Sequence, residues 1–456
     1  MKKMLSILLA ALIVCALAVT AFAEDVTCDI VVVGGGGAGM TAAIKATEAG
    51  KKVILVEKEV RLGGNTLLGS SVFNAANSSL QKENNVEATP EAWAEKLHKA
   101  NAAATEPAIK YLTEQSGAAA DWLYGIGMDL TRVFNVFGHG PADGSAPGIK
   151  IVDAMQKEMD RLGIDYRVEA EATKILKDEN GKICGVRVND SYDIKASAVI
   201  MASGGFAANN ELIVEYDPRW NGLSYSCSSS ATGEGTLIAR EAGAALSHMT
   251  NVKVNPTAYY LDETTCFSVA PLRINGCAMI THDGVRVLNE EGAYTANSEI
   301  IVANGGEIYM VFDYTLVDKI AAIESYEKAG YLVSAPTLEE LADKIDVNKE
   351  AFLETCAKFS EYAKNGADPD FGKPNFTTDL TNAPFYAMLA KPAVQGTFGG
   401  ISVNERAAVL DEAGNVIEGF YAAGECADEG TMGEAPLTVN VVFGTLAAQS
   451  AVEDLK

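Results

Sequence analysis

The sequence predicts an α/β fold, and three stretches carry that prediction. Residues 29–58 run from an apolar segment (Ile30–Val33) through a glycine-rich turn and a helix-like segment to a second apolar segment (Val53–Val56). A buried strand, a helix and a second buried strand in that order are typical of a βαβ unit with parallel strands. Further strand-like segments that end in glycines occur near residues 198–204 and 419–425. They predict more strands of the same sheet.

The glycine turn has the spacing of a dinucleotide site. Gly34, Gly36 and Gly39 form a G-x-G-x-x-G pattern directly before the helix-like segment. The first glycine makes the tight turn, the second lets the backbone approach a pyrophosphate, and the third lets helix and strand pack closely. Glu57 follows about 20 residues later, where a carboxylate can bind ribose hydroxyls. We therefore expect a Rossmann-like dinucleotide domain; the alternative is a glycine-rich turn in another α/β protein.

The composition sets the class of protein. The chain has 456 residues, enough for two or three domain-sized units, and 48% of them are hydrophobic. The formal net charge of −25 argues against nucleic acid and anionic membranes as partners. The eight cysteines are scattered and form no C-x-x-C pair, so neither a disulfide framework nor a metal site is indicated.

The N-terminus is typical of a secretory signal peptide over residues 1–23. Lys2 and Lys3 precede an apolar segment (Leu5–Val19), and Ala21 and Ala23 form an A-x-A cleavage site. An uncleaved anchor is the alternative. We expect export to the periplasm, the cell surface or the medium, and no later segment is long and apolar enough to span a bilayer.

The rest of the chain changes character twice, which predicts an inserted domain. We expect the dinucleotide domain in residues 24–250 and 391–456 and an inserted α+β domain in residues 251–390. Helices are expected near 90–125, 149–162, 236–242, 337–363 and 439–455, short strands over 164–203, a linker over 368–384 and a hairpin at 410–416.

Eight short motifs then occur in an order that resembles one flavoprotein family. They are GGGGAG (Gly34–Gly39), Glu57-Lys58, GGNT (Gly63–Thr66), ASGGF (Ala202–Phe206), TGEG (Thr232–Gly235), GGISVN (Gly399–Asn404), YAAGE (Tyr421–Glu425) and VFGTLAA (Val442–Ala448). The set resembles the fumarate reductase/flavocytochrome c family, which includes urocanate reductases and 3-ketosteroid dehydrogenases. The resemblance implies bound FAD, a Rossmann-like FAD-binding domain split by a mobile capping domain, and a substrate site between the two.

The resemblance also implies which residues hold FAD. The pyrophosphate would lie on the glycine turn, the adenosine ribose on Glu57, and a ribityl or ribose hydroxyl on Glu425, while the last helix would offer N–H groups to the pyrimidine carbonyls of the flavin. The expected cofactor-binding residues are Gly34, Gly36, Gly37, Ala38, Gly39, Glu57, Lys58, Gly64, Asn65, Thr66, Ser70, Ser71, Ala172, Gly204, Glu234, Glu425, Leu437 and Thr438.

Two features concern how the flavin is held and reduced. Asn65 stands where membrane-bound relatives carry the histidine that bonds covalently to FAD, so we expect non-covalent FAD. No second glycine-acid unit follows, which argues against an internal NAD(P)H site. Electrons would come from an external carrier, such as an FMN-bearing protein, a cytochrome or a quinol-linked system.

The expected substrate site departs from that of fumarate reductases. Asn255 and Gly396 stand where those enzymes carry histidines, and residues 433–444, which precede and open the last helix, contain no basic residue where an arginine is expected. Those groups grip the two carboxylates of fumarate, and glycine cannot replace a carboxylate clamp. We therefore expect a small-molecule substrate that is not a dicarboxylate.

The expected proton donor also differs. Tyr294 falls where fumarate reductases carry their catalytic arginine, Ala270 replaces the glutamate that relays protons to it, and Arg273 is retained. A phenol is protonated at neutral pH, so it can donate to a developing carbanion, and Arg273 can stabilise the phenolate. The alternative is a tyrosine that only stacks on substrate or packs in the domain interface.

Two further residues are candidates for substrate contact. His139, in the loop GHGPADG, either contacts substrate or orders its own loop, and Tyr259 either forms an aromatic wall or packs between domains. The sequence thus predicts an FAD-dependent reductase of an activated C=C bond in an enone, enoate or steroid-like compound, with hydride from flavin N5 and a proton from Tyr294. The alternatives are a CH–CH dehydrogenase, or an electron-transfer or sensor flavoprotein.

Overall fold

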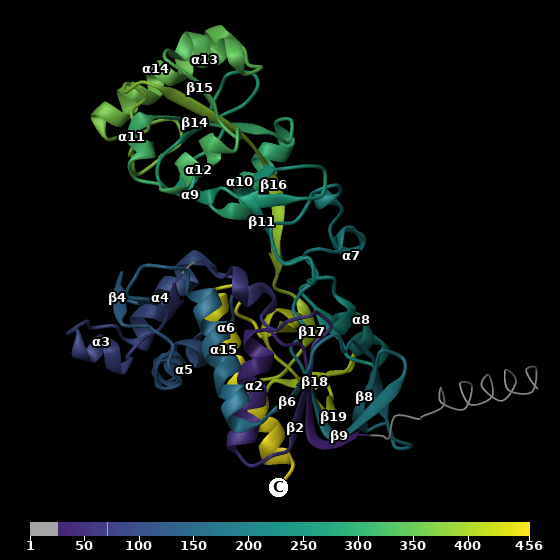
Figure 1. Cartoon of the computed structure of the whole chain (residues 1–456). Helices are drawn as coiled ribbons and strands as arrows, with labels where there is room; N and C mark the ends of the chain where they lie inside the picture. The colour runs from purple at the N-terminus through teal and green to yellow at the C-terminus, as the bar shows by residue number, and fades with distance from the viewer. Residues whose placement is uncertain (1–25, 71) are drawn as a thin grey trace, which may run out of the picture. The chain divides into compact units, whose positions relative to one another are not determined.

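The computed structural model describes residues 26–70 and 72–456, and these fall into two compact units (Figure 1). The predicted signal peptide and Ser71 lie outside the described residues. The first unit comprises the described residues up to Gly204 together with Glu234–Ser247 and Gly400–Lys456, and the second comprises Gly205–Gly233 and His248–Gly399. The boundaries therefore differ from those expected, because residues 205–233, 248–250 and 391–399 lie in the second unit. One reason is that Tyr225 bridges Val394 of a second-unit strand.

The first unit is built on an eight-stranded sheet. Its centre is parallel: β1 (Val26–Val33) lies between β2 (Val53–Val56) and β9 (Tyr192–Met201). The other strands of this sheet are β6 (Asp165–Arg167), β7 (Ala172–Lys177), β8 (Ile183–Val188), β18 (Ala408–Leu410) and β19 (Val416–Ala422). The order is β18-β19-β9-β1-β2-β6; β8 pairs antiparallel with β9, and β7 pairs antiparallel with β8. The expected short strands and hairpin are present.

Both faces of this sheet are covered. Along β1, Ile30 and Val32 belong to one hydrophobic cluster, and Val31 and Val33 belong to another. Successive side chains of a strand point to opposite faces, so a strand buried on both sides must be apolar throughout. This is why residues 30–33 read as an unbroken apolar segment.

Three long helices pack together in the first unit. The buried helix α2 (Gly37–Glu48) lies against α15 (Pro436–Asp454) and α6 (Pro147–Leu162), as Figure 1 shows. The remaining helices of this unit are η1 (Gly64–Leu68), α3 (Ser79–Glu83), α4 (Pro90–Ala100), α5 (Glu106–Gly125), α8 (Glu234–Glu241) and η3 (Gly424–Cys426). Two small sheets complete it: β3 (Phe73–Asn74), β5 (Gly138–Gly140) and β4 (Arg132–Phe134), and β10 (Leu246–Ser247), β17 (Gly400–Ser402) and β20 (Ala427–Asp428).

The second unit is an antiparallel sheet with helices. The long strand β16 (Phe385–Thr397) lies between β11 (Val252–Tyr260) and β14 (Ile308–Asp313). The outer strands are β12 (Cys266–Ser268), β13 (Ala278–Ile280) and β15 (Val333–Ala335). The helices are α7 (Asn210–Tyr216), η2 (Pro218–Trp220), α9 (Ala270–Ile274), α10 (Tyr294–Ala303), α11 (Tyr314–Val317), α12 (Ala322–Lys328), α13 (Leu338–Lys344) and α14 (Lys349–Asn365).

The helical stretch expected at 337–363 is present as two helices, because the side chain of Asn348 accepts a hydrogen bond from the backbone N–H of Ala351 and caps a new helix, α14. One expectation for the second unit was wrong. The linker expected at 368–384 is part of the folded core: Asp368, Lys373 and Leu380 are all buried. Among the described helices, none combines the length and the apolar character needed to cross a bilayer.

Candidate functional site

The glycine turn after β1 is a cradle whose first and third glycines are sterically required. Gly34 has a φ of +105°, and a Cβ there would lie 2.3 Å from the carbonyl oxygen of Ala202. A Cβ on Gly39 would lie 1.9 Å from the carbonyl oxygen of Gly34. By contrast, a Cβ on Gly36 would meet no atom within 4 Å. Gly36 therefore faces open space, as a residue against which a pyrophosphate rests must do.

The N-terminus of α2 lies at this cradle. Gly36 is the N-cap and has no side chain to cap the helix, and the first turn of α2 carries no acidic residue. Free N–H groups and the positive end of the helix dipole therefore remain for an anion at Ala38 and its neighbours. One N–H is already bound: Gly37 donates to Oγ1 of Thr66 at 3.0 Å.

Glu57, at the end of β2, is anchored against the turn. One carboxylate oxygen accepts from the N–H of Gly35 at 2.7 Å and the other from the N–H of Glu59 at 2.8 Å, and the residue is 8% exposed. The next residue, Lys58, forms an ion pair of 2.8 Å with Glu234 at the start of α8. The carboxylate is thus fixed beside the glycine turn, which fits the expected ribose contact.

The loop after β2 connects the cradle to the C-terminal part of the unit. Asn65 donates from Nδ2 to Oε2 of Glu425 at 2.7 Å, which brings together two expected cofactor residues 360 positions apart. Thr66 is buried and also accepts from Nδ2 of Asn440, on α15, at 3.5 Å. Asn65 has no nucleophilic group, so this position cannot form the covalent flavin bond.

The other expected cofactor residues lie on several elements of the first unit. Leu437 and Thr438 form the first turn of α15, where the hydroxyl of Thr438 donates to the carbonyl of Asn74 at 2.7 Å. That hydroxyl fixes the helix start and leaves backbone groups for a ligand. Gly64 lies in η1, Ala172 is the first residue of β7, and Gly204 is the last residue before the chain enters the second unit. Ser70 is exposed.

In the second unit, a phenol and two cations form a cluster. Tyr294 is the first residue of α10, and the Cζ atom of Arg273 lies 4.4 Å from the centroid of its ring. Nζ of Lys253, on β11, lies 5.1 Å from the same centroid. Arg273 is 1% exposed, and its Nε and Nη2 have no hydrogen-bond partner among the described residues. Buried donors without partners cost free energy, so these N–H groups are available to an oxygen atom that binds here.

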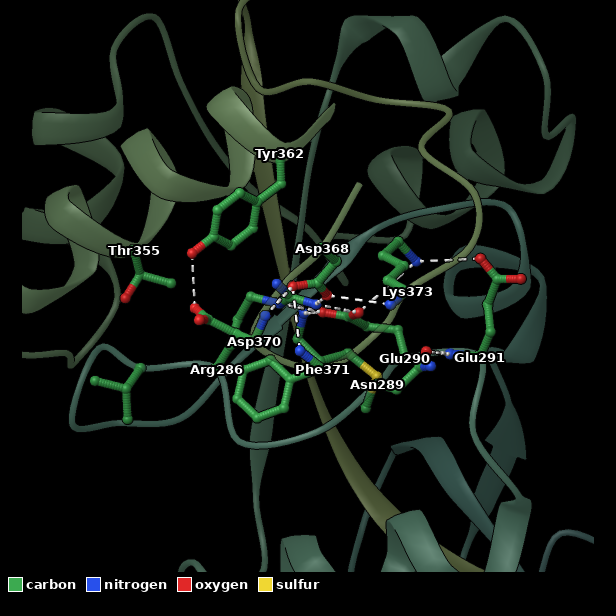
Figure 2. Close-up of polar contacts among 12 residues, drawn as sticks. Arg286, Asn289, Glu290, Glu291, Thr355, Tyr362, Asp368, Asp370, Phe371 and Lys373 are labelled. Atoms are coloured by element: carbon green, nitrogen blue, oxygen red, sulfur yellow. Dashed lines mark hydrogen bonds and ion pairs between the residues drawn. The ribbon is translucent and has the colours of Figure 1, made fainter. Parts of the chain in front are cut away.

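Arg286 and Glu290, in the segment that precedes Tyr294, belong to a buried ion network whose contacts are drawn in Figure 2. Arg286 donates two hydrogen bonds to the carboxylate of Glu290 and one to Asp368, all at 2.8 Å. Nζ of Lys373 lies 3.7 Å from the same Glu290 carboxylate. The backbone carbonyl of Glu290 in turn accepts from Nη1 of Arg273 at 2.6 Å. The network therefore fixes the guanidinium that lies over the Tyr294 ring.

Two of the expected substrate residues have their polar groups occupied locally. Asn255 is fully buried; its Nδ2 donates to the hydroxyl of Ser268 at 2.8 Å, and its Oδ1 accepts from the backbone of Thr257 at 3.1 Å. His139, in the first unit, is also fully buried: Nε2 lies 2.8 Å from the hydroxyl of Ser78 and Nδ1 lies 3.2 Å from the carbonyl of Phe137. These contacts favour loop ordering, rather than substrate contact, for His139.

The remaining two expected substrate residues lie on the sheet of the second unit. Tyr259 packs in an aromatic group, with its ring centroid 4.6 Å from that of Tyr331 and 5.7 Å from that of Phe267. Gly396, on β16, is the direct partner of Lys253 in the antiparallel pairing with β11. In the described part of the chain, no group of three or more His, Cys, Asp and Glu residues could hold a metal ion, and all seven cysteines are free thiols.

Sequence reasoning missed two residues that the structure brings to these sites. Lys253 precedes Asn255 by two positions, and the alternation of a strand could have placed both on one face. Its pairing with Gly396 could not be read from the sequence, since 143 positions separate them. Asn440 lies two positions after Thr438 on α15, but only the fold shows that its amide reaches Thr66.

The cradle defines a dinucleotide-binding protein, and comparisons with known proteins identify the family. Residues 29–442 match the family described as FAD binding domain. The fumarate reductase (cytochrome) of Shewanella frigidimarina is 32% identical over 452 residues, covering 96% of this chain and 79% of the relative. The urocanate reductase of Eggerthella lenta is 30% identical over 450 residues, covering 93% of this chain and 74% of the relative.

Solved structures agree with this assignment. An open conformation of a flavocytochrome c3 fumarate reductase is similar with a TM-score of 0.83 and 28% identity, over 95% of this chain and 79% of the other. A 3-ketosteroid Δ1-dehydrogenase from Sterolibacterium denitrificans shares the fold with a TM-score of 0.79 at 18% identity, over 94% and 99% of the two chains. The chain belongs to the FAD-binding domain family, and it is an FAD-dependent oxidoreductase with the predicted α/β flavoprotein fold.

Proposed function

We propose that the protein reduces an activated C=C bond in a conjugated substrate that is not a dicarboxylate, an enone, enoate or steroid-like compound, with Tyr294 as the proton donor. The relatives support the reaction class, because they are named for the reduction of fumarate and urocanate. One observation carries the role of Tyr294: the Arg273 guanidinium lies 4.4 Å from its ring centroid and is held there by the Glu290 carbonyl.

Non-covalent FAD is proposed to lie on the first unit. The glycine turn and the N-terminus of α2 would hold the pyrophosphate, Glu57 a ribose, Glu425 a further hydroxyl, and the first turn of α15 the pyrimidine edge of the flavin. The open space at Gly36 and the uncapped start of α2 support this arrangement. When bound, FAD would supply the hydride for the β-carbon of the substrate.

The second unit supplies the proton. In this proposal the hydroxyl of Tyr294 donates to the α-carbon, and Arg273 stabilises the phenolate that remains, with its unpartnered Nε and Nη2 available to an oxygen. Asn255 shapes the site through its hydrogen bonds to Ser268 and Thr257 rather than by binding substrate charge. Tyr259 would form part of an aromatic wall.

The lack of a strong carboxylate clamp supports the exclusion of dicarboxylates. Gly396 has no side chain, Asn255 is neutral, and residues 433–444 contain no basic residue. The proposal further includes export by residues 1–23 and electron delivery by an external carrier, such as an FMN-bearing protein, a cytochrome or a quinol-linked system. If the same site catalysed the reverse reaction, the protein would be a CH–CH dehydrogenase.

A second candidate, from a different class, is an electron-transfer or sensor flavoprotein without alkene reductase activity. The neutral residues at positions 255 and 396 favour it, because they are the positions at which the family resemblance implies substrate-binding histidines. This candidate requires only the FAD site of the first unit and gives Tyr294 no chemical role.

A dye-linked assay tests the proposal. The FAD-loaded protein is offered fumarate, urocanate, cinnamate, cinnamamide and an enone steroid with reduced viologen as donor, and oxidation of the dye is followed. We expect turnover of at least one conjugated monocarboxylate or ketone, and a loss of about 10²- to 10⁴-fold in kcat in Tyr294→Phe. An unchanged rate in Tyr294→Phe would sink the proton-donor role. Failure of every alkene to oxidise the dye would favour the electron-transfer or sensor protein.

A further inference from the structure

We propose that Lys253 is the substrate-binding cation of this protein, and that it selects a conjugated acid with a single carboxylate. The inference rests on the proposed function and narrows it to one substrate class. Its basis is a position in the sheet of the second unit: Lys253 on β11 lies directly opposite Gly396 on β16.

Opposite residues of an antiparallel pair present their side chains on the same face of the sheet, with Cβ atoms about 5 Å apart. The sequence resemblance implies a histidine at position 396, where this chain has glycine. Lys253 therefore lies on β11, on the face of the sheet where Gly396 of β16 has no side chain. On this face β11 thus presents a cation that can bind a carboxylate, opposite a residue of β16 that has no side chain.

The backbone of this region is irregular in a way that affects the lysine. The pairing of β11 with β16 shifts between Lys253 and Val254, since Lys253 pairs with Gly396 and Val254 with Val394. A bulge of this kind re-aims the side chains beside it. Here the ammonium group reaches a position 5.1 Å from the ring centroid of Tyr294.

The two cations at the phenol have different surroundings. Arg273 is almost fully buried and is tied to the carbonyl of Glu290, so it is suited to stabilise the phenolate. Lys253, by contrast, is only partly buried. An ammonium is a compact point charge on a flexible stem, which suits one carboxylate rather than the two carboxylates of fumarate.

The chemistry of the proposed reaction needs a cation at this place. If Tyr294 protonates the α-carbon, the carboxylate attached to that carbon must lie within a few ångströms of the Tyr294 hydroxyl. As hydride adds to the β-carbon, negative charge moves onto the α-carbon and its carboxylate, and the proton from Tyr294 then forms the new C–H bond. Lys253 would bind the carboxylate in the ground state, and the attraction between its ammonium group and the carboxylate would become stronger as this negative charge develops.

Matched acids and amides test the inference in the FAD-loaded protein. Acrylate, cinnamate and urocanate are each compared with their amides, which keep the shape and remove the charge. Lys253→Met keeps the length of the side chain and removes the ammonium group, and Lys253→Arg keeps a cation. Lys349→Met removes an exposed lysine of the same unit that pairs with Asp343, and serves as the control.

In Lys253→Met we expect KM for the preferred acid to rise about 10- to 100-fold, as for the loss of a charged hydrogen bond, and KM for its amide to change less than about threefold. The dissociation constant of the acid for the oxidised protein, measured by calorimetry, should rise by the same factor without any turnover. Lys253→Arg should recover most of the binding, and Lys349→Met should behave as wild type.

The failures are distinguishable. If none of the acids binds the wild-type protein, or if Lys253→Met weakens acid and amide equally or neither, the inference is overturned. If the acids bind in a Lys253-dependent way but no alkene oxidises the reduced dye, the carboxylate site stands and the reductase function fails.

Discussion

Arg286→Met should lower the free energy of unfolding of the second unit by about 3–5 kcal/mol, because it leaves buried carboxylates without their main cation. The side chains of Glu290 and Asp368 are fully buried, and that of Arg286 is 5% exposed. The substitution removes three hydrogen bonds of 2.8 Å to these carboxylates and leaves the Glu290 carboxylate an ion pair of 3.7 Å with Lys373.

The pH dependence of this effect has a definite sign. Burial alone would raise the pKa of Asp368, but the hydrogen bond and charge of Arg286 outweigh it, and the pKa is lowered. Asp368 therefore contributes stability that is present above its unfolded pKa, near 3.9, and is lost as the pH falls through the lower folded pKa. Because the contact with Asp368 involves its ionised carboxylate, the deficit of Arg286→Met should be full at pH 7 and narrow as the pH falls below about 4.

Urea unfolding followed by circular dichroism measures the difference, and an exposed pair provides the control. Arg187 makes a similar two-bond contact with Asp193, at 2.8 and 3.1 Å, but the two side chains are 44% and 20% exposed. Arg187→Met should therefore cost less than about 1 kcal/mol. In thermal scans, each kcal/mol corresponds to about 2–4 °C for a unit of this size. A loss in Arg286→Met no larger than that in Arg187→Met would refute the reasoning.

Two further predictions concern the first unit. Gly36→Ala should leave the stability of the FAD-free protein nearly unchanged but weaken FAD binding at least tenfold, as measured by flavin fluorescence. Gly39→Ala should destabilise the FAD-free protein as well, because its Cβ would meet the Gly34 carbonyl oxygen at 1.9 Å. Equal effects of the two substitutions on the stability of the FAD-free protein would contradict this prediction. Burial lowers the pKa of His139, so its contribution to stability is full above pH 6.5 and is lost as the pH falls below that value. In His139→Gln the free energy of unfolding should fall less between pH 7 and pH 5 than in the wild type. The same pH dependence in both proteins would contradict this prediction.

The parts that the sequence predicted well are local. The apolar segment 30–33, the glycine turn and Glu57 lie within 30 positions, and each follows from the requirements of a strand, a tight turn and a helix start. The hairpin at 410–416 was also predictable, since Leu410 and Val416 pair across a short turn. In such places the residue types and their spacing contain nearly all of the information.

The parts that it missed depend on contacts between distant segments. Residues 368–384 contain proline and asparagine, as a linker does, yet Asp368 and Lys373 are buried because Arg286 and Glu290, about 80 positions earlier, neutralise them. Lys253 gains its position only from the register of β11 against β16. The composition of a segment does not show which charged residues from distant parts of the chain will lie beside it in the folded protein.

The chain passes between its two units four times, at 204/205, 233/234, 247/248 and 399/400. Neither unit is therefore a continuous cassette that could be deleted or exchanged by a single cut and join. During synthesis, β19 cannot pair with β9, nor α15 pack on α2, until the last 60 or so residues have left the ribosome. Glu425 and Thr438 also belong to that final stretch. Flavin uptake should thus report completion of the whole chain, so that a truncated product remains colourless.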